Sequence, residues 1–411
     1  MQIEKQMDQI FTNARLASQE LLLLNGSERS SILLKMADKI EKNASKILSA
    51  NQKDIELSKA KMKESELDRL RLSESRIKAI ANDVRMISAL SDPVGIENGW
   101  TVKNGLKIRK VRVPFGVIGA IYESRPNVTA DIAALCIKSG NAAILRGSSN
   151  AINSNRAIME AISAAVPKNS VQLVDTTDRA AVGLMMQARG KIDLLIPRGG
   201  ADLIRRTVEE SKVPVIETGT GNCHVFVDES ADLIRAVDII INSKCQRPGT
   251  CNSEEKLLVH KSIADEFIPK VAKALRQNGV EVRACPLTMM ILGDAIAAKE
   301  DDWSKEYLDL IIAIKVVNDV DEAISHINKY NSKHTEAILT NNSENAEKFA
   351  KLIDAAAVNI NASTRFTDGG QYGFGAEVGI STQKLHARGP MGLFELTTYK
   401  YVVTGNGQIR E

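Results

Sequence analysis

The chain has 411 residues, of which 44% are hydrophobic and 26% are charged, and its formal net charge at pH 7 is +3. This length is too great for one hydrophobic core and predicts two or more domains. The composition is that of an ordinary globular protein. Lys and Arg are spread along the chain and no apolar run is long enough to span a membrane, so we expect no nucleic-acid and no membrane partner.

The cysteines and the first residues bear on the compartment. The five cysteines, at positions 136, 223, 245, 251 and 285, show no paired CxxC spacing. We therefore expect neither a disulfide framework nor a metal site. The opening MQIEKQMDQIFTNAR is polar and carries acids, unlike a secretory signal or a transit peptide. A reducing, cytoplasmic location fits both features.

The first third of the chain predicts a helical layer and a hairpin. From residue 5 to about 90, apolar residues recur at three- and four-residue spacing, and we expect one helix to begin near Ser27. Residues 100–113 carry Asn104-Gly105 between two strand-like runs, which predicts a β-hairpin. This hairpin is either an arm that contacts another subunit or a plain surface hairpin.

From Pro114 onward, apolar strands alternate with helices, beginning at FGVIGAIY and reaching the predicted strand VPVIET at 213–218. This order predicts a parallel sheet that is covered on both faces. A second alternation from residue 223 predicts a second sheet domain. The Gly-rich tail 365–391 is long enough to be either functional or a linker. The final strand GLFELTTYKYVVTG could pair with the hairpin or with another subunit.

Ligands of parallel sheets bind where strands end and helices begin, which directs attention to the loops of the first sheet. The Asn127 amide could donate a hydrogen bond to an oxyanion, or it could cap the following helix. Arg146, with Ser148 and Ser149, offers a cation and hydroxyls to a phosphate or a ribose.

Two further loops of this sheet have candidate roles. Arg198, Gly199 and Gly200 open a predicted helix, whose free N–H groups attract pyrophosphate, or they form only a tight turn. Glu217 precedes two glycines and is either a mobile carboxylate near a reacting centre or a partner in a strand-end salt bridge. The chain has no GxGxxG, so this is not an ordinary dinucleotide fingerprint.

Cys251 is the candidate nucleophile. The stretch NSKCQRPGTCNSEE at 242–255 follows a helical run and breaks at Pro248-Gly249. A thiol beside the Arg247 cation and, if a helix begins there, at its N-terminus is where a lowered pKa is expected. A thiolate attacks carbonyl carbon and forms a thioester or thiohemiacetal. The alternative is one more small buried residue, because free cysteine is among the most buried types.

Several motifs in a fixed order carry a family resemblance over the whole chain. They are VPFGVIGAIYESRPNVT, ILRGSS, IPRGGADLIR, ETGTGNCHVFVD, QRPGTCN and GFGAEVGIST…ARGPMGL. These closely resemble the gamma-glutamyl phosphate reductases, also called glutamate-5-semialdehyde dehydrogenases, a family of the aldehyde dehydrogenase superfamily. VDEAISHINKYNSKHTEAI resembles that family's own signature and departs from it at Asn331, where the family usually has a small residue.

The resemblance implies an aldehyde-dehydrogenase-like α/β fold with two parallel-sheet domains and a small β-hairpin and strand arm. Residues 1–99 and 115–222 would bind the cofactor, and 223–391 would form the catalytic domain with Cys251. Residues 100–114 and 392–411 would form an oligomerisation arm, which implies a homo-oligomer.

The resemblance also implies a reaction, the NADPH-dependent reduction of L-glutamyl 5-phosphate to L-glutamate 5-semialdehyde with release of phosphate. This is the second step of proline biosynthesis from glutamate, with glutamate 5-kinase as the upstream enzyme. Cys251 would carry a thioester, and Asn127 and the Cys251 backbone N–H match the superfamily's oxyanion donors. Arg247 would help to bind the phosphate.

The remaining residues follow from the same resemblance. NAD-using members often have a glutamate that binds the adenosine ribose, whereas Arg146 supplies a cation that suits the 2′-phosphate of NADP. Glu217 matches the carboxylate of hydrolytic members, and Glu306 resembles a ribose-binding glutamate. Ser363 and Arg365, in a polar cluster with Thr364, are candidates for the amino-acid end of the substrate; Arg365 could instead pair with Asp368 in a surface turn.

Two alternatives differ in function. The first is an acylating aldehyde dehydrogenase that acts on another acyl phosphate or on an acyl-CoA. The second is a binding or scaffold protein that keeps the fold without catalysis; against it, Cys251, Asn127 and Arg146 are all present.

Overall fold

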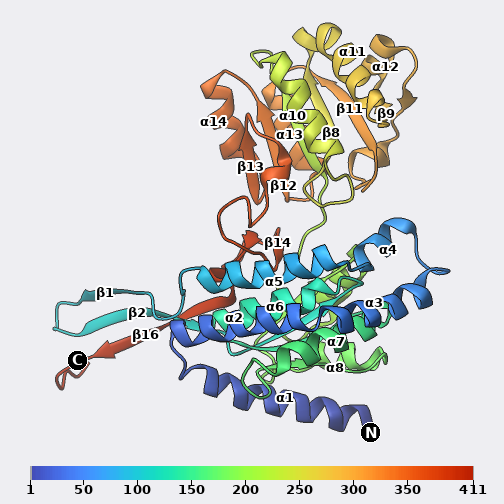
Figure 1. Cartoon of the computed structure of the whole chain (residues 1–411). Coiled ribbons are helices and arrows are strands. Elements are labelled where there is room, and N and C mark those ends of the chain that lie inside the picture. Colours follow the sequence, from blue (N-terminus) through green and yellow to red (C-terminus); the bar gives the residue numbers. More distant parts are fainter. Residues whose placement is uncertain (1, 411) are drawn as a thin grey trace. The chain divides into compact units, whose positions relative to one another are not determined.

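The computed structural model describes residues 2–410, which form two compact units (Figure 1). Unit 1 takes in the described residues up to Thr218, then Gly373–Gly379, and those from Met391 onward; unit 2 comprises Gly219–Tyr372 and Ile380–Pro390. The chain therefore leaves unit 1 just before the predicted boundary at 222. The assignment of the predicted ranges to cofactor binding and catalysis stays a prediction.

The predicted helical layer at the start of the chain is confirmed. Its helices are α1 (Gln2–Leu21), α2 (Gly26–Lys42), α3 (Ala44–Ser58), α4 (Glu64–Leu70) and α5 (Glu74–Ala89). Helix α2 is capped by Asn25 rather than by Ser27. The Asn25 side chain accepts the Glu28 N–H at 3.0 Å while Glu28 accepts the Asn25 N–H at 2.7 Å, a capping box that satisfies donors at the helix start.

The sheet of unit 1 is parallel, as predicted. Its strands are β3 (Val117–Tyr122), β4 (Ala142–Arg146), β5 (Val171–Leu173) and β6 (Leu194–Arg198), in the order β5-β4-β3-β6. The helices that follow them are α6 (Asn127–Lys138), α7 (Ile152–Ser163), α8 (Ala180–Met186) and α9 (Ala201–Glu210). Every residue of β3 and β4 is buried, which explains their continuous apolar sequence.

The predicted strand VPVIET is wrong. Only Val215 forms a β-bridge, with Leu195, and no strand extends from it. The Leu195 N–H donates to the carbonyl of Pro214 at 2.9 Å, but a proline has no N–H with which to continue the pairing.

The predicted hairpin is present and extends away from the helices of unit 1 (Figure 1). Strands β1 (Glu97–Thr101) and β2 (Lys107–Pro114) are antiparallel, and Gly105 between them has a φ of 82°. The C-terminal strand β16 (Thr397–Thr404) pairs antiparallel with β2, which confirms the first of its two predicted partners.

Unit 2 holds a seven-stranded parallel sheet in the order β10-β9-β11-β8-β7-β12-β13. Its strands are β7 (Cys223–Val227), β8 (Glu254–His260), β9 (Glu281–Ala284), β10 (Ile296–Ala297), β11 (Ile311–Val317), β12 (Thr335–Leu339) and β13 (Ala357–Ile360). Its helices are α10 (Leu233–Cys245), α11 (Lys261–Gln277), α12 (Pro286–Leu292), α13 (Val320–Tyr330) and α14 (Ser343–Leu352). Branched and aromatic side chains form a core on each face of the sheet.

The tail 365–391 has little regular structure. It begins in a short 3₁₀ turn, Thr364–Phe366, and contains the strands β14 (Gly379–Ser381) and β15 (Gly389–Met391), which form a two-stranded sheet. Across residues 2–410, no helix combines the length and the apolar character needed to cross a membrane.

Candidate active site

Cys251 lies in the connection between α10 and β8 and is half-buried. It comes after the C-terminal end of α10, and the next element is a strand, so the suggested helix N-terminus at this cysteine is wrong. The turn is closed locally, because the Thr250 hydroxyl donates to the Arg247 carbonyl at 2.8 Å and the Ser253 N–H donates to the Thr250 carbonyl at 3.0 Å. Arg247 itself is exposed.

A glycine allows the neighbouring segment to touch this turn. A β carbon on Gly221 would overlap the carbonyl group of Cys251, so no other residue fits there without moving the backbone. The Gly221 N–H donates to Glu306 Oε1 at 2.6 Å, and the thiol of Cys223 lies 3.2 Å from the Cys251 carbonyl oxygen. Glu306 thus holds the segment that packs on Cys251; its predicted role at a cofactor ribose stays a prediction.

Arg365 reaches the same turn from the start of the tail. Its Nε donates to Gln246 Oε1 at 2.8 Å, and its Nη1 donates to Asn252 Oδ1. The Asn252 amide also donates to the carbonyl of Thr367 at 2.9 Å, so it clamps the residue after Cys251 to the tail. Burial and the nearby Arg247 lower the pKa of Arg365, while Asp368 and Cys251 oppose that shift.

The suggested surface turn at Asp368 exists without the arginine. Asp368 accepts the N–H groups of Gly370 at 2.9 Å and Gln371 at 3.2 Å, whereas the Arg365 guanidinium is directed to Gln246 and Asn252. Ser363 is buried, accepts a hydrogen bond from the Ser243 hydroxyl at 2.9 Å and accepts the Arg365 N–H at 3.2 Å. Ser363 therefore shapes the turn that presents Arg365.

Charged side chains are buried where the strands of unit 2 begin. Glu336 Oε2 accepts the His224 N–H at 2.7 Å and lies 3.0 Å from His224 Nδ1. Burial raises the pKa of Glu336 and lowers the pKa of His224, which favours the neutral form of each. Lys256 Nζ donates to the Lys305 carbonyl at 2.8 Å, and burial lowers the pKa of Lys256 to about 7.

Asn127 is the first residue of α6 and does not cap it; Pro126 occupies the N-cap position. The Asn127 amide donates to Asp131 Oδ2 at 2.8 Å, one turn further along the helix. Asp131 is half-buried, and its Oδ1 atom is buried without a hydrogen-bond partner among the described residues. Desolvation raises its pKa to about 7; the hydrogen bond from Asn127 and the nearby Arg198 oppose the rise, and Asp83 adds to it. The helix-cap alternative for Asn127 is therefore wrong, whereas its oxyanion role stays a prediction.

Arg146 ends strand β4 and is buried. Its guanidinium donates to the carbonyl oxygens of Gly147 and, at 3.5 Å, of Thr177, and its buried Nε has no hydrogen-bond partner among the described residues. Burial, aided by the nearby Arg179, lowers the pKa of Arg146. The Ser148 hydroxyl accepts the Asn150 N–H at 3.2 Å, and Ser149 begins the short 3₁₀ helix that precedes α7.

Gly199 and Gly200 lie at the N-terminus of α9, as predicted, directly after Arg198 at the end of β6. The Gly200 N–H donates to Glu123 Oε2 at 2.9 Å, so a carboxylate of the chain itself already engages this helix start. A pyrophosphate bound there would have to displace Glu123. Glu217 is half-buried and follows the Val215 bridge to β6.

The predicted residues thus form a group in each unit. In unit 1, Asn127, Arg146 and the Gly199-Gly200 pair follow three neighbouring strands, and in unit 2 Arg365, Ser363 and Glu306 surround the turn of Cys251. Sequence reasoning missed most of the residues that support them, namely Asp131, Cys223, Gln246 and Asn252. Gln246 and Asn252 lie inside the motif QRPGTCN, which was the signal available for them.

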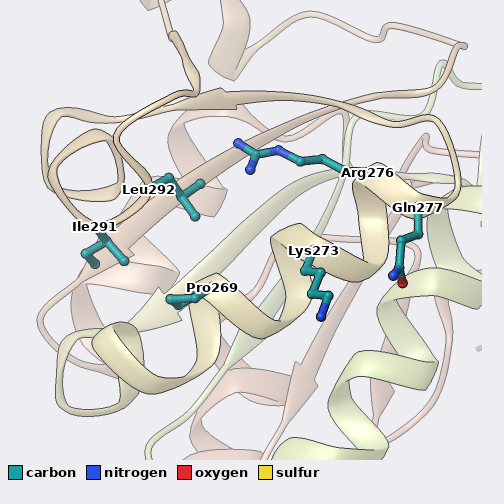
Figure 2. A pocket seen from close by; sticks show the side chains of 6 residues that line it. All are labelled: Pro269, Lys273, Arg276, Gln277, Ile291 and Leu292. Atoms are coloured by element: carbon teal, nitrogen blue, oxygen red, sulfur yellow. The ribbon is translucent and has the colours of Figure 1, made fainter.

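A cavity of about 490 Å³ lies elsewhere in unit 2. Figure 2 shows Pro269, Lys273, Arg276 and Gln277 on α11, facing Ile291 and Leu292 of α12. None of the predicted site residues lines it, so this cavity is not the candidate active site.

Comparison with known proteins decides the family. The sequence matches the aldehyde dehydrogenase family over residues 2–310 and 303–402. The chain belongs to the aldehyde dehydrogenase family. Among curated members of this family, it is 56% identical to a gamma-glutamyl phosphate reductase of Caldanaerobacter subterraneus, over 97% of this chain and 98% of the relative. It is 54% identical to that of Carboxydothermus hydrogenoformans, over 98% and 100%.

Solved aldehyde dehydrogenases share the fold. The crystal structure of gamma-glutamyl phosphate reductase from Thermotoga maritima matches with a TM-score of 0.96 and 52% identity, over 98% of this chain and 100% of that one. An acetylating aldehyde dehydrogenase from Geobacillus thermoglucosidasius matches with a TM-score of 0.73 and 20% identity, over 100% and 98%. The predicted fold class and the family resemblance are confirmed. As a member of the aldehyde dehydrogenase family, the chain is an enzyme that acts on a small-molecule substrate and uses a nicotinamide cofactor.

Proposed function

We propose that the chain reduces L-glutamyl 5-phosphate to L-glutamate 5-semialdehyde with NADPH and releases phosphate, as the second step of proline biosynthesis. The observation that carries the proposal is the near-full-length identity of 54–56% to gamma-glutamyl phosphate reductases, in a chain that keeps QRPGTCN around a half-buried cysteine. The acyl phosphate itself must come from a kinase that phosphorylates glutamate, and we propose glutamate 5-kinase for that step.

Cys251 is the proposed nucleophile. Its thiolate attacks the acyl carbon of glutamyl phosphate, the C–O bond to phosphate breaks with its electron pair, and a thioester remains. An acyl phosphate is already activated, so no general base is needed to expel phosphate. Arg247 is exposed in the same turn and supplies a cation to the leaving phosphate.

The oxyanion formed in this attack needs donors. We propose the backbone N–H of Cys251 and the amide of Asn127. Asp131 supports the second donor, because its carboxylate accepts one amide hydrogen of Asn127 and thereby fixes the plane of the amide. Asn127 belongs to unit 1 and Cys251 belongs to unit 2.

The groups of unit 1 suit a phosphorylated nicotinamide cofactor. Arg146 is a buried cation with an unpartnered Nε at the end of β4, and such a group favours an anionic ligand. We propose that Arg146, Ser148 and Ser149 hold the 2′-phosphate. The bound cofactor supplies hydride to the thioester carbon.

Other cofactor contacts are proposed at the edges of this group. Arg198, Gly199 and Gly200 would receive the pyrophosphate after Glu123 leaves the Gly200 N–H. Glu217 and Glu306 would contact the ribose and nicotinamide side of the cofactor.

Arg365 is the proposed reader of the substrate's α-carboxylate. Gln246 and Asn252 hold its Nε and Nη1, which fixes the plane of the guanidinium beside the turn of Cys251. Its planar fork matches a carboxylate, and the buried Ser363 sets the backbone that presents it.

We also propose that strands β1, β2 and β16 form an arm that contacts another copy of the chain. Trp100, Tyr399 and Tyr401 are half exposed on these strands, and the Trp100 and Tyr401 rings meet edge to face with centroids 6.2 Å apart. Exposed aromatic side chains in a group favour protein contacts.

The test is an NADPH oxidation assay with glutamyl phosphate generated in place by a glutamate kinase and ATP. We expect oxidation that depends on the kinase, on ATP and on Cys251. Acetyl phosphate and acetyl-CoA serve as competing substrates. Turnover with either of these but not with glutamyl phosphate would replace the proposal by the acylating-dehydrogenase alternative.

A further inference from the structure

A second cysteine contacts the backbone of the proposed nucleophile. Cys223, the first residue of β7, is fully buried, and its Sγ lies 3.2 Å from the carbonyl oxygen of Cys251. A thiol at this distance donates a weak hydrogen bond to a carbonyl oxygen. Because the acceptor is the backbone of Cys251 itself, the bond acts on the orientation of that residue.

The segment that contains Cys223 is locked on its N-terminal side. Gly221 packs directly on the Cys251 carbonyl, and its N–H is held by Glu306 at 2.6 Å. The ladder between β7 and β8 pairs Cys223 with Glu254 but His224 with Lys256, so β8 has one extra residue at this point. Such a bulge redirects the side chains beside it.

The C-terminal side of Cys223 is locked as well. Glu336 accepts the His224 N–H at 2.7 Å, and both residues are fully buried. A shift of this backbone would leave a buried donor without a partner, which costs about 1–3 kcal/mol. Cys223 therefore has a fixed position from which to hold the Cys251 carbonyl.

Cys223 also keeps the proton that a donor needs. Burial, together with the nearby Glu336 and Cys251, raises the pKa of the Cys223 thiol well above its ordinary value. It therefore stays a thiol at neutral pH and does not compete with Cys251 as a nucleophile.

We propose that Cys223 is a positioning residue for Cys251. Its S–H···O bond fixes the carbonyl of Cys251 and, through the shared Cα, the direction in which the nucleophilic sulfur points. The inference rests on the proposed function, because it assigns a task to the residue that attacks the acyl carbon. A nucleophile whose direction is lost reacts more slowly while substrate binding is kept.

The test compares Cys223→Ser, which keeps a donor, with Cys223→Ala, which removes it. Cys285→Ala is the matched control, because Cys285 is also a buried thiol of unit 2 but contacts the Thr288 hydroxyl. Steady-state assays with glutamyl phosphate give kcat and KM. Alkylation of Cys251 by iodoacetamide, followed by peptide mass spectrometry across pH, gives its intrinsic reactivity without substrate.

We expect Cys223→Ala to lower kcat about five- to tenfold, the effect of one weak hydrogen bond, with KM unchanged within about twofold. The alkylation rate at its high-pH plateau should fall about threefold or more. Cys223→Ser and Cys285→Ala should stay within about twofold of the wild type in every measurement.

Two results would overturn the proposal: wild-type kcat in Cys223→Ala, or equal losses in the serine and alanine variants. If Cys223→Ala does not fold, Cys223→Val replaces it, since valine fills the space without a donor, and the same outcomes decide. Failure of the proposed function can be told apart from failure of this inference. In the first case the wild type would not reduce glutamyl phosphate, although the alkylation rates could still separate the variants.

Discussion

The two parallel sheets differ in which ends of their strands carry the candidate residues. In unit 1, Asn127, Arg146 and Arg198 stand at or just after the carboxyl ends of β3, β4 and β6. In unit 2, Cys251 lies before the amino end of β8, and Gly221 lies before the amino end of β7. Ligands of open α/β sheets bind at carboxyl ends, a rule that locates the loops of unit 1 but would pass over Cys251. The proposed nucleophile was located from the Pro248-Gly249 break, the neighbouring Arg247 and the motif QRPGTCN.

The sheets also differ in what they bury. In unit 1, strands β3 and β4 are apolar apart from Arg146 at the last position. In unit 2, strands β7, β8 and β12 bury His224, Glu254, Lys256 and Glu336 completely. Buried charges lower stability unless they are paired. Burial shifts the pKa of each of these four side chains in the direction that favours its neutral form, and this limits that cost.

The largest effect should come from unit 2 and leave unit 1 untouched. Cys251→Ser should reduce turnover of glutamyl phosphate by about a thousandfold or more, because an alkoxide is far less available than a thiolate. NADPH affinity, measured by fluorescence titration, and the melting temperature should match the wild type. Cys285→Ser is the control. Retention of a tenth of wild-type turnover would contradict the nucleophile assignment.

An aspartate with a raised pKa, Asp131, gives unit 1 a pH dependence of its own. The pKa of Asp131 in the folded protein is about 7, above its ordinary value. Between about pH 4 and pH 7 the native state therefore keeps a proton that the unfolded state has released. The stability of the wild type therefore falls over that window. At pH 8, the free energy of unfolding of Asp131→Asn should exceed that of the wild type by about 2–4 kcal/mol. At pH 5 this difference should be smaller.

Urea unfolding at both pH values measures this difference. Asp202→Asn, at an exposed aspartate of the same unit, is the control and should show no pH-dependent gain. If Asp131→Asn changed the free energy of unfolding equally at pH 5 and pH 8, Asp131 would be ionised in the native state at both pH values. Its pKa would then not be raised.

Periodicity and turn residues predicted most of the fold, because helices, buried strands and the Asn104-Gly105 hairpin are set by local sequence. VPVIET failed because its apolar residues fit a strand while Pro214 cannot extend one. The contacts of the site were beyond prediction for another reason. Cys223 meets Cys251 across 28 residues and Arg365 meets Asn252 across 113, and no local pattern encodes such pairs.

A substitution of Arg146 tests whether unit 1 binds the 2′-phosphate of NADPH. Arg146→Ala should weaken NADPH binding about 10- to 100-fold, the value of one charge-assisted contact, and NADH binding less than about threefold. Isothermal titration with both cofactors measures this ratio. Arg156→Ala is the control, since Arg156 is an exposed arginine of α7 that pairs with Asp175. Equal losses for both cofactors would remove Arg146 from the 2′-phosphate.

A substitution of Arg365 tests whether unit 2 binds the α-carboxylate of the substrate. It should have the smallest effect of these variants. Its guanidinium is held at Nε by Gln246 and at Nη1 by Asn252, so its plane is set before any substrate arrives. A lysine keeps the charge but loses the planar fork and both of these contacts. Arg365→Lys should therefore raise the KM for glutamate 5-semialdehyde in the reverse reaction about five- to tenfold, which corresponds to roughly 1 kcal/mol.

The KM for NADP should stay within about twofold in the same variant, because the side chain belongs to unit 2 and the proposed phosphate contacts belong to unit 1. Arg388→Lys is the matched control, since Arg388 is a half-buried arginine of unit 2 that pairs with Asp354 at 2.7 Å. A rise in the KM for NADP alone would place Arg365 on the cofactor side. No change in either constant would mean that its bonds to Gln246 and Asn252 only hold the tail against the turn of Cys251.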